Sequence, residues 1–337
     1  MPWDSPETFT NSTAFKIMDS PPGVSAEVAI GGSFMGCNHK AFRAPGPSAA
    51  MAASMAFVFF NLSCSPVQAQ KADSGPLLRA FKVYIFADME GCSGVTGSEQ
   101  IGGAKADEGK RLMAEDMNAC IAGCFAAGAA EVVVRDGHSG GKNVDPKLID
   151  QRAKLVQGAT PGVRFKDMDG SEALILLGYH AKALTPGGVL AHSYSSASIQ
   201  GMWLNGREVG EIGVDAAIAA EHKVPVVMVS GDDKVAAEAR AWIPGVVTCE
   251  VKKGTGPQSA DVIPLEKARD LIRQKTVEAL AKRGEIRPVA IMYPATIRWD
   301  YLPKGSLRTH NPEFKPVDNP RRVEKTGDSV EKLLVGK

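Results

Sequence analysis

The sequence predicts an α/β protein with a layered α/β/α fold, a largely parallel or mixed sheet, and a second, interleaved smaller domain. From residue 82 onward the apolar runs are short, rich in β-branched residues and separated by helical patterns, which indicates repeated βα units. Hydrophobic residues make up 44% and charged residues 23% of the chain. These values are those of an ordinary globular protein and exclude disordered, collagen-like and coiled-coil classes.

The expected elements follow from the periodicity of apolar residues. We expect strands at 82–87, 131–135, 174–178, 226–230, 246–251 and 289–293, helices at 111–127, 211–221, 233–242 and 265–283, and an extended segment at 189–192. Strands at 200–204 and 207–209 form a hairpin, because Asn205-Gly206 between them is a strong signal for a tight turn. Residues 294–337 are rich in Pro, Lys and Arg, so we expect an irregular C-terminal tail with at most a short helix near its end.

The N-terminal region has the order of a secretory signal peptide. Within residues 35–69, Lys40 and Arg43 precede an apolar run at 49–60 and the small-residue end Val67-Gln68-Ala69. A run of about twelve residues is too short for a membrane span of ~20 residues. We therefore expect cleavage after Ala69, a linker at 70–81, and a periplasmic or secreted protein with no membrane span in its mature chain. A buried helix and lipidation at Cys64 are the weaker alternatives.

Residues 1–34 precede that signal without any periodic segment, so we interpret them as an upstream, non-native extension of the reading frame. Removal of residues 1–69 from the 337-residue chain leaves 268, which suits one large or two interleaved α/β domains. Four of the six cysteines remain in that part, with no CxxC spacing among them. We expect them to be small buried thiols rather than zinc ligands or a disulfide scaffold.

The charge balance and the motif search narrow the function. With 39 Lys and Arg against 38 Asp and Glu, the net charge is +1, which gives no electrostatic reason to expect nucleic acid or an anionic membrane as the main partner. A P-loop and the GxGxxG and HExxH motifs do not occur in the sequence. We expect a small or neutral ligand and a site assembled from dispersed residues.

Polar side chains follow three of the predicted strands. Asp88 and Glu90 come after the first strand, His138 after the second and His180 after the third, and Glu211 opens a helix. Because the carboxyl ends of strands in open α/β sheets face the crevice where ligands bind, these side chains can converge on one site. Two acids and two histidines in such a place form a plausible metal shell.

Each of these residues alone has a plainer interpretation. The acids can be a solvated loop pair, the histidines ordinary core or loop residues, and Glu211 a partner of the helix dipole. Their joint placement favours metal binding, and imidazole with carboxylate ligands favours zinc over manganese or iron. Five ligands exceed the need of one catalytic zinc, so two metals that share a carboxylate and clamp an attacking water fit better.

In order and spacing, six segments resemble the zinc-dependent D-aminopeptidases of the DppA-like peptidase family M55. The resemblance covers about residues 82–293 and is carried by Asp88-Met89-Glu90-Gly91, Asp136-Gly137-His138-Ser139, Leu177-Gly178-Tyr179-His180-Ala181, Ala191-His192-Ser193, Asn205-Gly206 with Gly210-Glu211, and Val229-Ser230-Gly231-Asp232-Asp233. Each segment is modest, but six in register over some 200 residues are specific.

The resemblance implies a two-zinc aminopeptidase that releases N-terminal D-residues such as D-Ala from short peptides, in a ring-shaped homo-oligomer. It implies that Asp88 bridges the metals and that Glu90, His138, His180 and Glu211 complete the two shells. His192 matches the residue regarded as catalytic in the family. We assign it a general acid or base role, because a metal-activated water is already a competent nucleophile.

Two other functions stay open at this point. One is a periplasmic peptide-binding component of dipeptide uptake, in which the metal shell is structural. The other is a metallo-aminopeptidase or amidase of L specificity, since the handedness of the substrate is set by pocket shape and not by metal ligands. An unliganded base such as His192 favours an enzyme over a binding module.

Overall fold

The strands form two sheets of different kinds. The computed structural model describes residues 80–302 and 321–335, all of which fall in one compact unit. The larger sheet has seven strands in the order β3-β2-β1-β4-β7-β8-β9, parallel throughout except for the antiparallel pair β8 and β9. Its strands are β1 (Phe81–Ala87), β2 (Ala129–Asp136), β3 (Lys154–Val156), β4 (Ala173–Leu177), β7 (Val226–Asp232), β8 (Val247–Gly256) and β9 (Ser259–Val262).

The smaller sheet is antiparallel and has the order β11-β10-β5-β6. It consists of β5 (Ile199–Leu204), β6 (Arg207–Glu208), β10 (Ala295–Tyr301) and β11 (Arg321–Gly327). β5 and β6 lie between β4 and β7 in the sequence, so the two sheets are interleaved along the chain. The predicted smaller domain corresponds to this antiparallel sheet. The predicted α/β class with a mixed sheet is confirmed.

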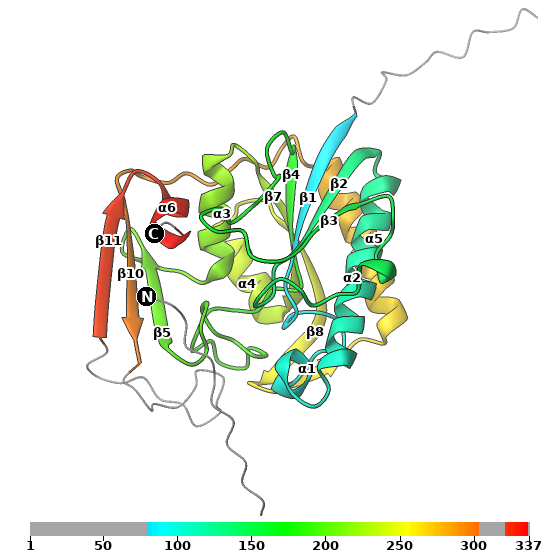
Figure 1. Cartoon of the computed structure of the whole chain (residues 1–337), viewed down its shortest axis with the longest axis horizontal. Helices are drawn as coiled ribbons and strands as arrows, with labels where there is room; N and C mark the ends of the chain where they lie inside the picture. Colours follow the sequence, from blue (N-terminus) through cyan, green and yellow to red (C-terminus); the bar gives the residue numbers. More distant parts are fainter. Residues whose placement is uncertain (1–79, 303–320, 336–337) are drawn as a thin grey trace, which may run out of the picture. The chain divides into compact units, whose positions relative to one another are not determined.

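Helices cover both faces of the larger sheet (Figure 1). The helices are α1 (Ser98–Gly102), α2 (Ala106–Ala126), α3 (Glu211–Glu221), α4 (Asp233–Trp242), α5 (Leu265–Ala281) and α6 (Val330–Val335), with a 3-10 turn at Pro146–Leu148. α2 and α5 lie on one side of the sheet, and α3 and α4 on the other, with α3 between the two sheets. Residues 211–219 of α3 are all buried, and apart from Glu211 and Asp215 they are apolar or glycine, as expected for a helix packed on every side.

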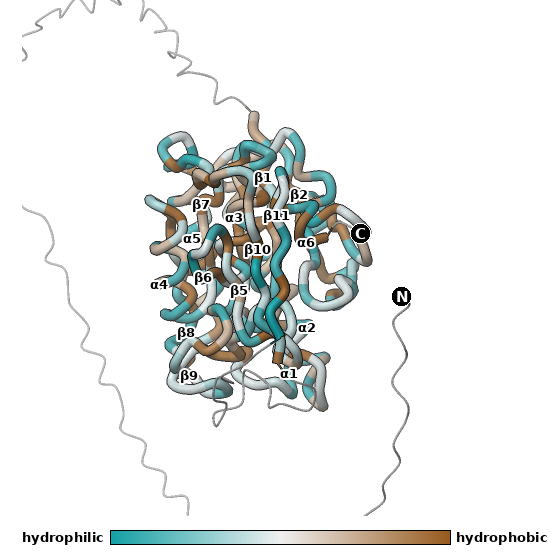
Figure 2. Tube along the Cα trace, turned by 90° about the vertical axis from the view of Figure 1, so that its left-hand side faces the viewer, coloured by the Kyte–Doolittle hydropathy of each residue, from teal (hydrophilic) through white to brown (hydrophobic). Residues whose placement is uncertain are grey.

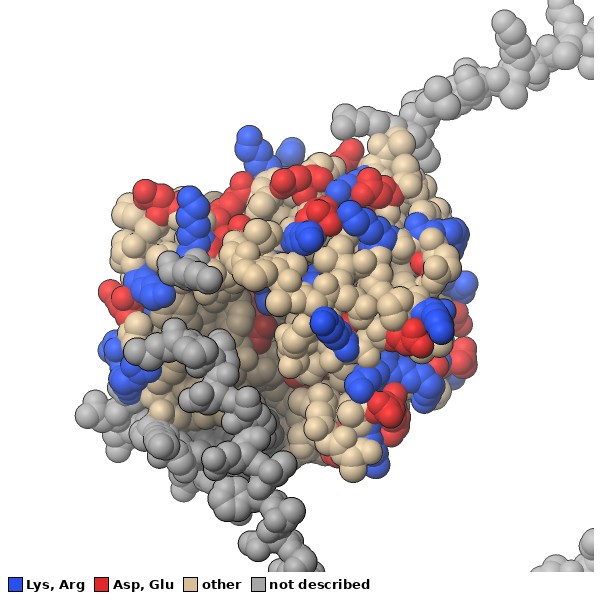
Figure 3. Space-filling model, viewed as in Figure 1, with Lys and Arg blue, Asp and Glu red and all other residues tan. Residues whose placement is uncertain are grey.

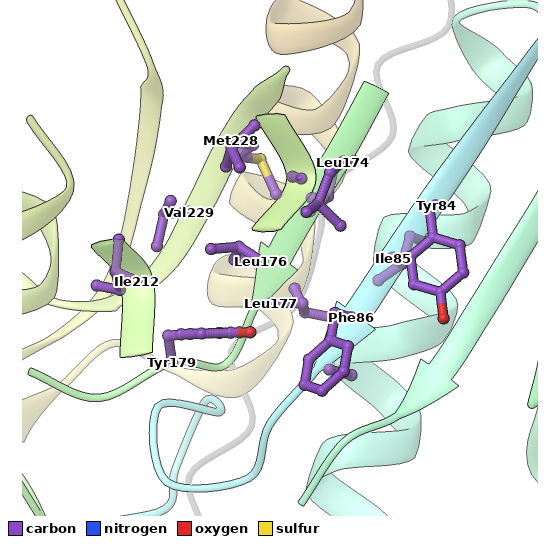
Figure 4. Close-up of a cluster of buried hydrophobic side chains, with 14 of the residues drawn as sticks. Tyr84, Ile85, Phe86, Leu174, Leu176, Leu177, Tyr179, Ile212, Met228 and Val229 are labelled. Atoms are coloured by element: carbon purple, nitrogen blue, oxygen red, sulfur yellow. The ribbon is translucent and has the colours of Figure 1, made fainter. Parts of the chain in front are cut away.

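The core is centred on three strands that are buried on both faces. Every residue of β4 and β7 is buried, and so are six of the seven in β1. Side chains of these strands pack together with Ile212 of α3 (Figure 4). Parallel strands covered by helices read as continuous apolar runs for this reason. By contrast, β11 at the edge of the smaller sheet is mostly hydrophilic (Figure 2).

Several predicted elements match the structure closely. α3 and α4 have the predicted bounds. The hairpin of β5 and β6 turns through Asn205 (φ 51°) and Gly206 (φ 80°), the pair of positive φ angles that a type I′ turn requires. The four cysteines of the described part are free and buried, as expected.

The prediction of an irregular C-terminal tail is wrong. β10 pairs with β5 and β11, and α6 follows them. β11 is rich in charged residues because it is an exposed edge strand, and not because the tail is irregular. Charges on the residues that face solvent discourage pairing with other chains. The apolar periodicity that would reveal a core strand is therefore missing.

Two other expectations also fail. Residues 289–293 form no strand, because Pro288 and Pro294 bracket the run and neither offers an N–H to a sheet. Val189 and Leu190 form a turn in which Leu190 has a φ of 51°, so residues 189–192 are not an extended segment. α2 begins at Ala106 rather than at 111, and α1, β3 and β9 were too short for periodicity to predict.

The signal peptide, the upstream extension and nearly all of the linker lie outside the described residues. Within residues 80–302 and 321–335, no helix has both the length and the apolar character needed to cross a membrane. Basic and acidic side chains are interspersed over the face shown in Figure 3. That distribution agrees with the near-neutral net charge and offers no large basic surface there.

Candidate metal centre

All six candidate residues meet at the carboxyl edge of the larger sheet, around a cavity of about 390 Å³. They come from the loops after β1 (Asp88, Glu90), β2 (His138) and β4 (His180, His192) and from the first turn of α3 (Glu211). The chain runs from β1 to β2 on one side of β1 and returns to β4 on the other. The cavity therefore lies where the strand order reverses, which is the usual ligand crevice of such sheets.

Asp88, Glu90 and His138 form the first group of candidate ligands. The Nδ1 atom of His138 lies 3.1 Å from Asp88 Oδ1 and 3.0 Å from Glu90 Oε2. The other ring nitrogen, Nε2, lies 3.3 Å from the carbonyl oxygen of Ile101. A backbone carbonyl can only accept, so Nε2 keeps its proton, and when a metal binds, the lone pair of Nδ1 would face it beside the two carboxylates.

His180, His192 and Glu211 form the second group. Glu211 Oε1 lies 3.2 Å from His180 Nε2 and 4.0 Å from His192 Nε2. The two imidazole rings stack with their centroids 3.8 Å apart. Nδ1 of His180 lies 3.0 Å from the carbonyl of Ala181, and Nδ1 of His192 lies 2.9 Å from that of Leu190. These contacts direct both Nε2 atoms towards the centre.

Asp88 connects the two groups. Its Oδ1 faces His138, and its Oδ2 lies 3.5 Å from His180 Nε2. This is the arrangement of a carboxylate that can serve two cations at once. The fit to a metal has an independent sign, because His180 Nε2 is buried and makes no hydrogen bond of acceptable geometry, although carboxylate oxygens lie 3.2 and 3.5 Å away. Buried polar atoms without partners are rare, and a cation at this point would satisfy the lone pair.

Electrostatics within the site are strong. Burial lowers the pKa of His138, but Glu90 and Asp88 outweigh it and raise the pKa to about 11. Burial likewise opposes the charged form of His180, whose pKa Glu211 and Asp88 raise to about 10. Burial raises the pKa of Glu211, but His180 and His192 lower it to about 2. Glu211 therefore stays ionised, as a metal ligand must be, and His138 and His180 would each release a proton when a metal binds.

His192 differs from the other histidines. Burial and the neighbouring His180 hold its pKa below the ordinary value. Its side chain is 13% exposed, compared with 1% for His180. His192 therefore presents a neutral imidazole to the cavity near pH 7.

Two glycines allow the loops after β1 and β4 to touch. The N–H of Gly91 donates to the carbonyl of Gly178 at 2.8 Å. A Cβ atom on Gly91 would lie 1.9 Å from the carbonyl oxygen of Tyr179, and one on Gly178 (φ 70°) would lie 2.4 Å from that of Asp88. Glycine at both positions is what brings Asp88 close to His180.

Some polar residues in the resembling segments support the site without entering it. Asp136 accepts hydrogen bonds from the N–H groups of Asn143 and Val144, which folds the loop that carries His138. Asp232 accepts from the N–H of Val189, in the loop that carries His192, and also caps α4. Asp136 and Asp232 therefore follow strands in order to shape the loops that carry His138 and His192, and not to act as metal ligands.

Two cations at the site were not predicted from the sequence. Arg164 lines the cavity, and its Nη2 lies 3.6 Å from Glu211 Oε2. Lys252 is buried, and its ammonium donates to the carbonyls of Glu90 and Cys92 at 2.7 and 3.0 Å. Both lie outside the six resembling segments, and no local pattern marks either of them.

Comparison with known proteins decides the family. The model of the M55 peptidases, described as D-aminopeptidase, matches residues 81–334, which is most of the chain. The chain belongs to peptidase family M55. The M55 match extends past residue 293 and so includes β10, β11 and most of α6, in agreement with their place in the fold. The predicted D-aminopeptidase, a hydrolase, is confirmed, and a peptide-binding transport component is not favoured.

Individual M55 relatives support the assignment. The D-aminopeptidase of Bacillus subtilis (strain 168) is 35% identical over 212 residues, which are 62% of this chain and 77% of that protein. A solved structure is described as the Zn-dependent D-aminopeptidase DppA from Bacillus subtilis, a self-compartmentalizing protease. Its TM-score is 0.67 at 28% sequence identity, with 74% of this chain and 93% of that chain covered.

Proposed function

We propose that this M55 protein is a two-zinc aminopeptidase that removes N-terminal D-residues such as D-Ala from short peptides. The observation that carries the proposal is the connection of two ligand groups through the two oxygens of Asp88. Asp88, Glu90 and His138 would hold one ion, and Asp88, His180 and Glu211 the other. Carboxylate and imidazole ligands suit zinc, and the solved relative is described as zinc-dependent.

When bound, the two ions would polarise the scissile carbonyl and lower the pKa of a water molecule, so that it could attack as hydroxide near neutral pH. The chain itself supplies proton transfer. His192 Nδ1 is engaged by the carbonyl of Leu190, which leaves Nε2 free to accept a proton and return it to the departing amine. His192 also lines the cavity, so it can reach a bound peptide.

Assembly and location complete the proposal. We expect a homo-oligomer, which the family resemblance implies as a ring, and the description of the solved relative as self-compartmentalizing supports it. We expect export to the periplasm or medium through residues 35–69, on the basis of their signal-like order. The molar mass of the purified mature protein, measured by light scattering, tests the assembly, and a monomer would contradict it.

The substrate experiment compares D-Ala-D-Ala with L-Ala-L-Ala before and after removal of metal by a chelator. We expect hydrolysis of the D-dipeptide, its loss on chelation, recovery with zinc, and about two zinc ions per chain by elemental analysis. Faster hydrolysis of the L-dipeptide would favour an L-specific enzyme. Binding without cleavage would favour a peptide-binding protein, and full activity without metal would overturn the metal site.

A further inference from the structure

Arg164 has no role in the function proposed so far, yet it lies at the metal centre. Among the described residues that line the cavity, it is the one Lys or Arg. It comes from the connection between β3 and β4, outside the loops and the helix that carry the candidate ligands. Its side chain is 16% exposed. A permanent cation in this place needs a physical explanation.

The guanidinium of Arg164 is held firmly. Its Nε and Nη2 atoms donate to the two carboxylate oxygens of Asp215, each at 2.8 Å. The rings of Phe86 and Tyr194 lie 4.3 and 5.5 Å from its central carbon. Such a bidentate pair, with aromatic rings beside it, fixes the plane of the guanidinium as well as its position.

Asp215 is itself fixed by the elements that carry the metal ligands. It is fully buried and accepts a hydrogen bond from the Tyr179 hydroxyl at 2.6 Å, and Tyr179 directly precedes His180. The backbone N–H of Arg164 also donates to Glu331 of α6 at 2.7 Å. Arg164 is therefore placed by the loop after β4, by α3 and by the C-terminal helix together.

Arg164 faces one oxygen of Glu211 and leaves the other to the metal centre. Glu211 and Asp215 are four residues apart on α3, so both carboxylates lie on one face of the helix. Arg164 Nη2 lies 3.6 Å from Glu211 Oε2. The opposite oxygen, Oε1, accepts from the N–H of Tyr194 at 2.9 Å and faces His180 Nε2.

We propose that Arg164 is a positioning residue that holds Glu211 Oε2 away from the metals, so that Glu211 offers Oε1 alone as a ligand. The proposal rests on the proposed two-zinc function. Groups that orient a ligating carboxylate affect metal affinity even though they never touch the metal. Arg164 acts on the ion held by Glu211 and leaves the ion held by Glu90 and His138 unaffected.

The test measures zinc binding directly, by competition with a chelator on metal-free wild-type and variant proteins. Arg164→Lys keeps a positive charge beside Asp215 but loses the planar fork. We expect one of the two zinc ions to bind about 10- to 100-fold more weakly and the other to bind as in the wild type. Turnover of D-Ala-D-Ala should fall with little change in KM.

Two further variants separate positioning from simple stability. Arg164→Met alone would leave Asp215 as an unpaired buried charge, so the double variant Arg164→Met/Asp215→Asn removes both charges together. It should show the same selective loss of one ion. The matched control is Arg135→Lys, because Arg135 is another buried arginine whose guanidinium donates to the Gly158 carbonyl and contacts no candidate ligand. It should keep both zinc affinities.

Three outcomes for the Arg164 variants would overturn the proposal. Unchanged affinity for both ions in the Arg164 variants would show that Glu211 needs no such partner. An equal loss of affinity for both ions, together with a lower melting temperature, would indicate that Arg164 has a purely structural role. A raised KM for D-Ala-D-Ala but not for its C-terminal amide, with normal zinc binding, would make Arg164 a binder of the substrate carboxylate instead. A wild-type protein that binds no zinc would overturn the proposed function as well.

Discussion

The contact between the loops after β1 and β4 makes Gly91→Ala a direct test of how the metal centre is assembled. The new Cβ would lie 1.9 Å from the carbonyl oxygen of Tyr179, whereas ordinary van der Waals contact begins near 3.4 Å. The two loops must therefore separate by about 1.5 Å. The φ of Gly91 lies outside the left-handed region, so the effect of the substitution is steric and not a matter of backbone strain.

The expected magnitudes follow from that separation. Overpacking of this kind costs about 1–3 kcal/mol of the free energy of unfolding. Loss of the hydrogen bond from Gly91 to Gly178 adds about 1 kcal/mol. The same movement carries Asp88 away from His180, and a displacement of about 1 Å at a catalytic site can lower the rate about 10²-fold. Gly91→Ala should therefore lose stability, zinc and turnover together.

Urea denaturation, zinc content and hydrolysis of D-Ala-D-Ala measure the three effects on one preparation. The matched control is Gly140→Ala in the loop that carries His138, because a Cβ there would meet no atom within 4 Å. The control should behave like the wild type. If Gly91→Ala kept wild-type stability, zinc and turnover, the close approach of the two loops would not be what assembles the site.

Four further predictions concern the site, its surroundings and export. Asp88→Ala should lose both zinc ions, since its two oxygens face both ligand groups, and elemental analysis that finds one ion fully retained would exclude a bridge. His192→Ala should keep nearly all the zinc while turnover falls about 10²- to 10⁴-fold. Loss of an ion would instead make His192 a ligand, and loss of stability with normal turnover would make it a core residue. Glu238→Gln should be more stable than the wild type at pH 8 but not at pH 4. Burial raises the pKa of Glu238 from its ordinary 4.5 to about 7, so wild-type stability falls as the pH rises through that window, and urea denaturation at the two pH values checks the difference. N-terminal sequencing of the exported protein should begin at Gln70, and a protein that retains Met1 in the cytosol would contradict export.

The sequence by itself determined the α/β class, the order of the core elements and the six polar residues that meet around one cavity. β1, β4 and β7 were predictable because strands buried on both faces are continuous apolar runs, and this pattern is local. Asp88, His138 and His180 could be placed together because parallel strands share one carboxyl edge, whatever the order of the strands. The hairpin at Asn205-Gly206 was equally local, since two positive φ angles need those residue types.

Only the tertiary structure decided how the site is completed and how the chain ends. β10 pairs with β5 across some 90 residues of sequence, and the exposed edge strand β11 has no core periodicity to announce it. The pairing of Arg164 with Asp215, and its approach to Glu211, joins residues about 50 positions apart through side chains alone. Backbone periodicity reports which face of an element is buried, but it does not report which partner a buried charge will meet. The partner of Arg164 depends on how α3 packs between the two sheets.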